Sequence, residues 1–552
     1  MVIRSFLKFC IVLVLACAKV NSQTSFIWPL NSVNITGNYG EIRLNHFHSG
    51  LDFSTDGAEN LPIRCINDGY VSRIKISAGG YGKALYITHL DGKLSVYAHQ
   101  NKFNDSIEAY VHREQLIKQS FEIELFLKEN ELPVKYGEVI GYSGNTGNST
   151  GPHLHFELRN ELTEIPINPL IYYKLQDTVK PMVNAIAFYN INDSLQPAYI
   201  SSVRVKAKKD SLYCVKDSII LNNSNLGIAF CGYDKETVKG NPNNIYEVKM
   251  YLDGNLIYFH ELNFIAFDNV RYVNEYSDLI NKLQFQKCFA SKLFPSDMYK
   301  TLVNRGRVIL KDTLYHQLNF VFADEAGTKN TLTFYIKTKT FSEFESFNTR
   351  TGLFVNCVNS YFHEGDNWEI DLPAKTLFSD AFLYIEDDFT RNNSFTIEPN
   401  NVSFRLPGIV KFKLPRELFD YKEKIILKNN YTVLIPVRKN DLMQCNFKSF
   451  GKFELGIDTS GPKIKTKTSL KILNKISRVI ENLSFVMVDN LSGIDKYHVY
   501  INDKWVLASY DAKSDLLTLN FDEQTPHGEI NLKVEASDRL GNNTTFTLTL
   551  NR

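Results

Sequence analysis

The alternation of apolar and polar residues predicts strands along most of this chain. Residues 69–89, GYVSRIKISAGGYGKALYITH, alternate around tight, glycine-containing turns. Because successive side chains of a strand point to opposite faces, this pattern predicts an antiparallel sheet with short hairpins. Patterns with a helical period are scarce, and one of them predicts a short helix near Ile107–Lys118. We therefore expect a mainly β fold, with an antiparallel β domain followed by two or three β-sandwich modules.

Matching segments indicate a repeated module in the second part of the chain. DTVKPMV begins at Asp177 and DTSGPKI at Asp458, each leading from an Asp-Thr turn into a strand-like run. DEAGTKNTLTFYI begins at Asp324 and DRLGNNTTFTLTL at Asp538, each leading from an Asp-x-x-Gly turn into an alternating strand. These segments predict β-sandwich modules that resemble bacterial immunoglobulin-like domains. Their predicted bounds are 177–340, with an insertion near 260–310, and 458–552, with a further β-rich module at 341–457 between them.

Residues 1–22 are predicted to be a signal peptide. Arg4 and Lys8 accompany the apolar run FCIVLVLACA, which is followed by the small polar pair NS before Gln23. The run is shorter than the roughly 20 residues of a membrane-spanning helix, and no later segment has that pattern. We expect an exported protein of the periplasm or cell envelope, without a transmembrane segment in the mature chain. Lipid anchoring at Cys17 is the less favoured alternative.

Composition narrows the classes of partner and site. The 552 residues suggest several domains, and a formal net charge of +1 gives no electrostatic footprint for nucleic acid. The cysteines beyond residue 22 form no CxxC, which excludes zinc-ribbon and redox motifs. Cys214 and Cys231 are the nearest candidates for a disulfide, and buried free thiols are an equally good alternative.

Histidines concentrate where the chain is rich in glycine. Seven of the twelve lie between His46 and His155, in and around NHFHSGLDFS, VYAHQ and GYSGNTGNSTGPHLHFEL. In a strand, HLH presents both imidazoles on one face. A catalytic zinc site needs three protein ligands and one open position, and His48, Asp52 and one histidine of HLH supply such a set. The other histidine of HLH and His99 then remain available for proton transfer.

Other catalytic classes fit the spacings poorly. His363-Glu364 and His260-Glu261 lack the second histidine of HExxH, which excludes the zincin class. The two-histidine, one-carboxylate iron oxygenases use HxD, whereas the aspartate here lies four residues after His48. No GxSxG occurs, so a serine triad has no support.

Taken together, HSGLD, YAH and GNTGNSTGPHLHFE resemble the lysostaphin-type (LytM-like) zinc metalloendopeptidases, peptidase family M23, in their order and internal spacing. The resemblance covers about residues 28–170. It implies an antiparallel, β-rich catalytic domain, placed here at 23–176, with one Zn2+ bound by His48, Asp52 and His155. It also implies catalytic roles for His99 and His153, and hydrolysis of peptide bonds in peptidoglycan stem peptides or cross-links. The alternative is a non-catalytic cell-wall scaffold or amidase activator that uses the same fold.

Three further residues are candidates for the substrate groove. His46 is also a rival metal ligand, Arg43 is equally suited to a salt bridge, and Tyr97 is equally suited to packing. The connection between YAH and VKYGEVIG is longer than in compact members of the family, so it could wall the groove. The β modules are candidates for binding the cell wall or a protein partner. His89, before the Asp91-Gly92 turn, is expected to be structural.

Overall fold

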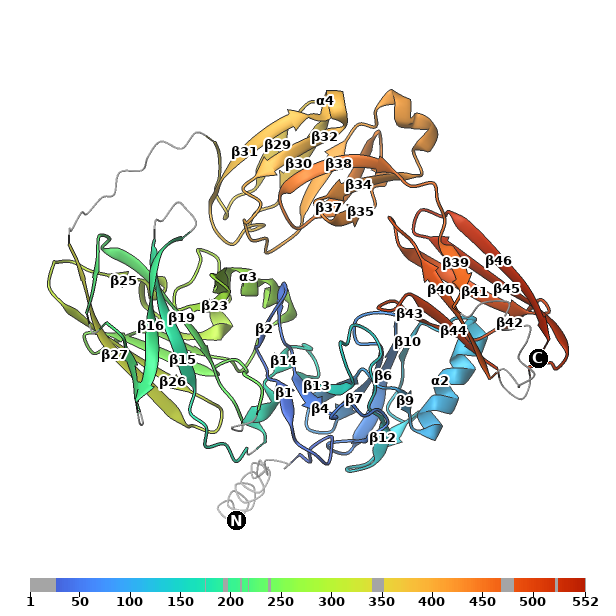
Figure 1. Cartoon of the computed structure of the whole chain (residues 1–552), viewed down its shortest axis with the longest axis horizontal. Helices are drawn as coiled ribbons and strands as arrows, with labels where there is room; N and C mark the ends of the chain where they lie inside the picture. The colour runs from blue at the N-terminus through green and yellow to red at the C-terminus, as the bar shows by residue number, and fades with distance from the viewer. Residues whose placement is uncertain are drawn as a thin grey trace, which may run out of the picture.

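The computed structural model describes residues 26–551 except 174, 192–196, 209–210, 217, 237–239, 340–351, 468–480 and 522–524. The predicted signal peptide lies outside the described residues. Nearly every described element is a strand, which confirms the mainly β fold predicted from the alternation (Figure 1). Among the helices of the described segments, none combines the length and the apolar character needed to cross a membrane.

The N-terminal domain is built on an antiparallel sheet of order β1-β4-β13-β8-β7-β6-β10. Its strands are β1 (Ile35–Gly37), β4 (Leu51–Ser54), β13 (His153–Asn160), β8 (Lys93–Ala98), β7 (Lys83–His89), β6 (Gly69–Ile76) and β10 (Ile123–Phe126), with β11 (Pro133–Val134) and β14 (Pro166–Ile167) at its margins. Smaller sheets are formed by β5 (Pro62–Arg64), β12 (Val139–Tyr142) and β9 (Lys102–Phe103), and by β2 (Ile42–Arg43) with β3 (His46–Phe47). The antiparallel sheet with the predicted β6–β7 hairpin is therefore present.

Helix α2 (Asp105–Lys118) lies in the long connection after β8. It begins two residues before the predicted Ile107, because the side chain of Asn104 caps it by accepting a hydrogen bond from the Ile107 backbone N–H at 3.0 Å. Ile107 and Val111 bury its inner face, and Gln119 ends it in a left-handed conformation. The extra length of the connection thus forms an ordered helix packed on the domain.

The segment after the N-terminal domain forms one large mixed sheet of order β22-β23-β19-β15-β16-β17-β27-β26-β20-β21-β24. Its strands are β15 (Met182–Asn190), β16 (Ala198–Lys208), β17 (Ser211–Cys214), β18 (Ser218–Leu221), β19 (Asn225–Tyr233), β20 (Glu247–Leu252), β21 (Asn255–Glu261), β22 (Ser277–Ile280), β23 (Leu283–Lys287), β24 (Tyr299–Leu302), β25 (Val308–Ile309), β26 (His316–Ala323) and β27 (Lys329–Thr338), with the short helix α3 (Val273–Tyr276) in the insertion. Cys231 is a free thiol, so the candidate disulfide with Cys214, one of the two alternatives left open, is not formed.

Residues 353–457 form two further antiparallel sheets, as predicted for this β-rich region. One contains β28 (Leu353–Val355), β31 (Ala381–Asp388), β32 (Ser394–Glu398), β38 (Gly451–Ile457), β34 (Ile425–Asn429) and β35 (Thr432–Leu434); the other contains β29 (Tyr361–Glu364), β30 (Trp368–Leu372), β33 (Gly408–Phe412), β37 (Leu442–Phe447) and β36 (Val437–Lys439), and the short helix α4 (Phe389–Asn392) joins β31 to β32. They share a core that includes Trp368 stacked on Phe395.

The C-terminal segment also pairs two sheets around one core. Its strands are β39 (Lys463–Thr466), β40 (Asn482–Val488), β44 (Leu516–Asn520) and β43 (Ala508–Asp511), facing β42 (Lys504–Val506), β41 (Ile494–Ile501), β45 (Glu529–Asp538) and β46 (Asn543–Asn551). A hairpin occurs in both modules, β20–β21 in the first and β41–β42 in the C-terminal segment. The immunoglobulin-like character of the modules and the domain bounds remain predictions.

The four parts follow one another around an arc that returns to the N-terminal domain (Figure 1). The C-terminal segment lies beside α2, where the Ala512 N–H donates to the carbonyl of Ala78 at 3.3 Å. Lys513 on this segment also donates to the carbonyl of Asn145. The C-terminal segment therefore contacts the glycine-rich loop that precedes β13.

Candidate metal centre and active site

One face of β13 carries a row of polar side chains. His153, His155, Glu157 and Arg159 occupy alternate positions, while Leu154, Phe156 and Leu158 on the other face are fully buried. The two-residue period of a strand produces this division, because alternate side chains share a face. The predicted side-by-side placement of the two HLH imidazoles above an apolar floor is therefore confirmed.

Asp52 reaches the same face from the neighbouring strand. β4 pairs antiparallel with β13 so that Asp52 lies directly opposite His155, and side chains at opposed positions are neighbours. Leu51 and Phe53 are fully buried and anchor β4 to the core. Gly50 matters for space, because a Cβ there would lie 2.2 Å from the carbonyl oxygen of Phe156. His48 follows β3 and its backbone N–H donates to the carbonyl of Glu41.

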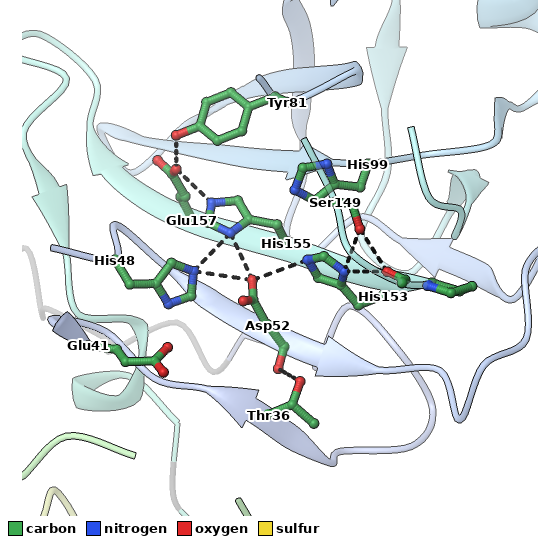
Figure 2. A network of polar contacts seen from close by, with 12 residues as sticks. Thr36, Glu41, His48, Asp52, Tyr81, His99, Ser149, His153, His155 and Glu157 are labelled. Atoms are coloured by element: carbon green, nitrogen blue, oxygen red, sulfur yellow. Dashed lines mark hydrogen bonds and ion pairs between the residues drawn. The ribbon is translucent and has the colours of Figure 1, made fainter. Parts of the chain in front are cut away.

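Three ligand-type atoms converge at this point (Figure 2). His48 Nε2 lies 3.0 Å from His155 Nδ1 and 3.2 Å from Asp52 Oδ1. His155 Nδ1 lies 2.9 Å from Asp52 Oδ1. The three atoms form a nearly equilateral triangle, and all three residues are buried.

The far nitrogens of both rings are already engaged. His48 Nδ1 lies 2.8 Å from the carbonyl of Asn38, and His155 Nε2 lies 2.8 Å from Glu157 Oε1. Because these oxygens only accept, the far nitrogens carry protons, and His48 Nε2 and His155 Nδ1 are the atoms that can offer a lone pair to a metal. Such outer hydrogen bonds fix the tautomer of metal-binding histidines. Both rings are thus oriented with lone pairs toward Asp52.

This donor set fits a zinc ion. Two imidazole nitrogens and a carboxylate are ligands that zinc prefers, and a tetrahedral ion with bonds of about 2.0 Å spaces its ligands by about 3.3 Å. The observed separations of 2.9–3.2 Å are close to that value. His48, Asp52 and His155 would therefore hold the metal. Their assignment as ligands remains a prediction.

The electrostatics of the site also favour a cation. Burial alone would lower the pKa of His155, but its hydrogen bonds with Asp52 and Glu157 raise the pKa to about 9. Burial would likewise raise the pKa of Asp52, yet His48 and His155 hold it well below its usual value. Two carboxylates on either side of the His155 imidazole thus stabilise a second proton on its Nδ1, and a bound metal ion would replace that proton.

His99 and His153 flank this group, and in each ring Nδ1 is already hydrogen-bonded to a backbone carbonyl. His99 Nδ1 lies 2.8 Å from the carbonyl of Thr146. His153 Nδ1 lies 2.9 Å from the carbonyl of Gly151, and the Ser149 hydroxyl, which donates to that same carbonyl, accepts from His153 at 3.1 Å. Both rings therefore carry their proton on Nδ1 and keep a lone pair on Nε2.

The free nitrogens face the metal-ligand group. His153 Nε2 lies 3.6 Å from Asp52 Oδ1, and the His99 and His153 ring centroids are 4.8 Å apart (Figure 2). Burial, together with His155 and His153, lowers the pKa of His99 to about 3, so its ring is neutral near pH 7. The rings of His99 and His153 thus lie beside the predicted metal ligands, each with Nδ1 hydrogen-bonded and Nε2 available.

Tyr97 is a correction. It was a candidate for the substrate groove with packing as the alternative, but β8 ends at Ala98, and the left-handed φ of 59° at His99 turns that side chain out of the strand pattern of Tyr97. Tyr97 is fully buried and its hydroxyl accepts from the Ile66 N–H at 3.1 Å. It belongs to the core and cannot line a substrate groove.

Arg43 and His46 lie on the β2–β3 hairpin. Arg43 makes the salt bridge that was its alternative role, donating to Asp52 Oδ2 at 2.5 Å and to Glu41 at 2.9 Å. It therefore holds the carboxylate oxygen that faces away from the histidines. His46 is exposed, its Nδ1 lies 2.9 Å from the carbonyl of Leu44, and it is outside the ligand triangle. A groove role for either residue remains a prediction.

Several residues of the site were not singled out from the sequence. Glu157 accepts from His155, from the Ser49 hydroxyl at 2.6 Å and from the Tyr81 hydroxyl, and the Tyr81 ring stacks on His155. Glu157 follows His155 by two residues, so the period that pairs His153 with His155 also places it on their face. Tyr81 and Ser49 carry no comparable signal, since only the fold brings them near. His89 is structural as expected, bonded to Ser95 at 2.7 Å.

Glu157→Gln is expected to weaken metal binding by about 10–100-fold. The neutral amide withdraws the charge that makes His155 a stronger ligand, and it leaves the buried Arg159, which donates to Glu157 at 2.6 Å, without its carboxylate. Competition with a chromophoric chelator measures the affinity. Glu164→Gln is the matched control, because Glu164 also pairs with Arg159, at 2.9 Å, but makes none of the contacts found at His155. Wild-type affinity in Glu157→Gln would contradict the proposed role of this hydrogen bond.

Comparison with known proteins finds a family model that matches the segment carrying this site. Residues 46–123 and 121–169 match the model of Peptidase family M23. The DD-carboxypeptidase/endopeptidase Mpg of Neisseria meningitidis serogroup B is 34% identical over 123 residues, 22% of this chain and 22% of that protein. The glycyl-glycine endopeptidase ALE-1 of Staphylococcus capitis is 31% identical over 111 residues, 20% of this chain and 24% of that protein. A zinc-containing peptidase from Vibrio cholerae is a similar solved structure, with 26% identity, a TM-score of 0.19, and coverage of 26% of this chain and 37% of that one. The chain thus spans less than a quarter of the length of these curated relatives.

Proposed function

We propose that this chain is a zinc metalloendopeptidase that hydrolyses peptide bonds in peptidoglycan, because residues 46–123 and 121–169 match the model of Peptidase family M23. The observation that carries the proposal is the convergence of His48 Nε2, Asp52 Oδ1 and His155 Nδ1 within 3.2 Å of one another. Two further imidazoles with free nitrogens lie beside them. A scaffold of the same fold has no need of this complete set.

A zinc ion, when bound, supplies Lewis-acid activation of water and of the scissile carbonyl. The residues of the chain handle the protons. His153 and His99 each present a lone pair on Nε2, so one of the two rings can accept the proton of the attacking water, and the low pKa of His99 makes it a weaker base than an ordinary imidazole. The imidazolium formed in this way is a donor, and it can pass the proton to the leaving amine.

The anchoring of these rings limits their other roles. With Nδ1–H committed to the Gly151 or Thr146 carbonyl, a neutral ring has no proton on Nε2 to offer a developing oxyanion. Only the ring that has accepted the proton can donate there. We therefore infer that oxyanion stabilisation by these histidines follows proton transfer, rather than preceding it.

The proposed substrate is the peptide part of the cell wall, either stem peptides or cross-links. The names of the relatives point to different bonds, a DD-peptide bond for Mpg and a glycyl-glycine bond for ALE-1. Hydrolysis of a peptide bond is the chemistry common to both names. We also propose export to the periplasm or cell envelope, supported by the basic and apolar pattern of residues 1–22.

The test is incubation of the purified chain with peptidoglycan sacculi under zinc-replete conditions and after chelation. Released muropeptides and new amino groups are measured. Metal-dependent release of cleaved stem peptides or cross-links is expected, and its loss on chelation should be reversed by zinc. If metal-loaded, folded protein leaves sacculi, a DD-peptide bond and a glycyl-glycine bond intact, the enzymatic proposal is overturned and the scaffold is favoured.

A further inference from the structure

Three aspartates meet where the first β module adjoins the N-terminal domain. Asp177 precedes β15, Asp234 follows β19 and Asp324 follows β26. Each offers a carboxylate oxygen, and these oxygens lie within 4.8 Å of one another. Asp234 and Asp324 are each only 4% exposed. Negative charge is thus gathered away from water at this point.

One oxygen of the group has no hydrogen-bond partner. Asp324 Oδ1 accepts from the Thr328 N–H at 2.8 Å, and Asp177 Oδ1 accepts from the Val179 N–H at 2.7 Å. Asp234 Oδ1, by contrast, is buried and unpartnered. Burying a carboxylate oxygen without compensation is costly, so this atom needs a cation or a proton.

A second unpartnered oxygen lies on the same face. Asn243 and Asp234 exchange both backbone hydrogen bonds, at 2.8 and 2.9 Å, and in such an antiparallel pair the two side chains point to one side. Asn243 Oδ1 is buried without a partner, while its Nδ2 donates to Glu236 at 2.7 Å. The surroundings therefore present only oxygen ligands, from carboxylates and an amide.

We propose that Asp177, Asp234 and Asp324 bind a calcium ion. An all-oxygen set with several carboxylates is typical of calcium, whereas zinc prefers nitrogen and sulfur. Calcium–oxygen bonds of about 2.4 Å allow ligand oxygens to lie up to about 4.8 Å apart, and the three carboxylate oxygens lie within that distance of one another, so one ion can contact all three. Magnesium demands a tighter octahedron and keeps its waters, which suits a buried cluster less well.

The charge balance supports the same conclusion. Burial, with Asp324, Glu325 and Asp177 nearby, raises the pKa of Asp234 to about 8. The neighbouring carboxylates therefore oppose its ionisation. A divalent cation would remove this penalty for all three aspartates together.

The ion would stabilise a segment that supports the zinc ligands. Beside Asn243, the Asn244 N–H donates to Asn38 Oδ1 at 3.1 Å, and Asn38 Nδ2 donates to the Asn244 carbonyl at 2.9 Å. The carbonyl of the same Asn38 accepts from His48 Nδ1. Calcium would thus fasten the β module to the strand segment that orients His48.

The C-terminal module offers an internal control. Asp458, Asp489 and Asp538 form a matching group at the equivalent Asp-Thr and Asp-x-x-Gly turns. Here protein donors reach each carboxylate: Ser492 N–H to Asp458 at 3.1 Å, Gly493 N–H to Asp489 at 2.7 Å, and Asn542 Nδ2 to Asp538 at 2.7 Å. This second group is satisfied by the protein itself and carries no proposal.

The test uses the full chain with its zinc retained and calcium removed by a calcium-selective chelator. Isothermal titration with calcium chloride should give saturable binding of one ion, with a Kd below about 1 mM. Asp234→Asn and, separately, Asp177→Asn should each weaken this binding at least about tenfold, through loss of a charged ligand. Asp489→Asn should bind calcium as the wild type does. Calcium should also raise the thermal unfolding midpoint of the wild type, but not of Asp234→Asn.

Two results would overturn the proposal. One is the absence of saturable calcium binding by folded wild type up to about 10 mM, well above the Kd of the weakest calcium modules. The other is binding that Asp489→Asn abolishes and both first-module variants retain. Circular dichroism and zinc content identify a variant that has failed to fold, and Asp177→Asn serves if the buried Asp234→Asn does so. Cleavage of peptidoglycan is scored separately, so either hypothesis can fail alone.

Discussion

His155→Ala is expected to remove the bound metal and to lower the peptidase rate by about 10³–10⁴-fold or more. Metal-ion catalysis supplies several kcal/mol of transition-state stabilisation, and each 1.4 kcal/mol is about tenfold in rate. His155 is central to the site, since its Nδ1 lies 3.0 Å from His48 Nε2 and 2.9 Å from Asp52 Oδ1. Its removal leaves only two ligand atoms.

Metal content after desalting and the initial rate on one substrate check this prediction together. His155→Gln is the companion variant, because it keeps most of the buried volume and can still contact Glu157. His46→Ala is the control, since His46 is exposed and lies outside the ligand triangle. Full metal occupancy in both His155 variants, with unchanged rate, would show that the metal is bound elsewhere.

The alternation of side chains along β13 predicts one part of this site, the row of polar residues on its face. The two-residue period of a strand predicts that His153 and His155 share a face, and the structure extends that row to Glu157 and Arg159. The two-residue period does not relate Tyr97 to His99 in the same way, because the strand does not continue unbroken to His99. The left-handed φ of His99 ends the period one residue earlier.

The meeting of Asp52 with His155 has a different origin. These residues are 103 positions apart, and they meet because β4 and β13 are adjacent antiparallel strands of the sheet. No periodicity within either segment specifies this pairing. The proximity of Asp52 and His155 could therefore be predicted only through the family resemblance. Tyr81, which stacks on His155 from a loop before β7, was missed for the same reason.

The aspartate clusters of the β modules were likewise only partly predictable from the sequence. The Asp-Thr and Asp-x-x-Gly segments predicted a repeat, and each repeat places two aspartates close together. The third member, Asp234 or Asp489, follows a strand whose surrounding sequence shows no match between the modules. The clusters therefore became visible only once the strands were placed. Their different hydrogen bonding is a property of side-chain geometry that no motif encodes.

His153→Ala and His99→Ala are expected to retain the metal while kcat falls by about 10²–10⁴-fold, the usual contribution of a positioned general acid or base. Neither ring supplies an atom to the ligand triangle, so affinity for zinc should stay close to that of the wild type. The lone pairs on Nε2 are lost with the rings, and the attacking water then lacks its proton acceptor. Single-turnover rates and metal content, measured on the same preparations, separate the two effects.

The double variant His99→Ala/His153→Ala tests whether the two imidazole rings act on the same proton. Both are anchored through Nδ1 to carbonyls of the Thr146–Gly151 segment, and their centroids are 4.8 Å apart. Residues that act as a unit give non-additive losses, so His99→Ala/His153→Ala should lose about as much as the more damaging single variant. Multiplicative losses would instead assign the rings to separate steps. If either single variant lost its zinc as His155→Ala does, the division between metal ligands and proton carriers would be wrong, because that ring would then be holding the ion rather than the proton.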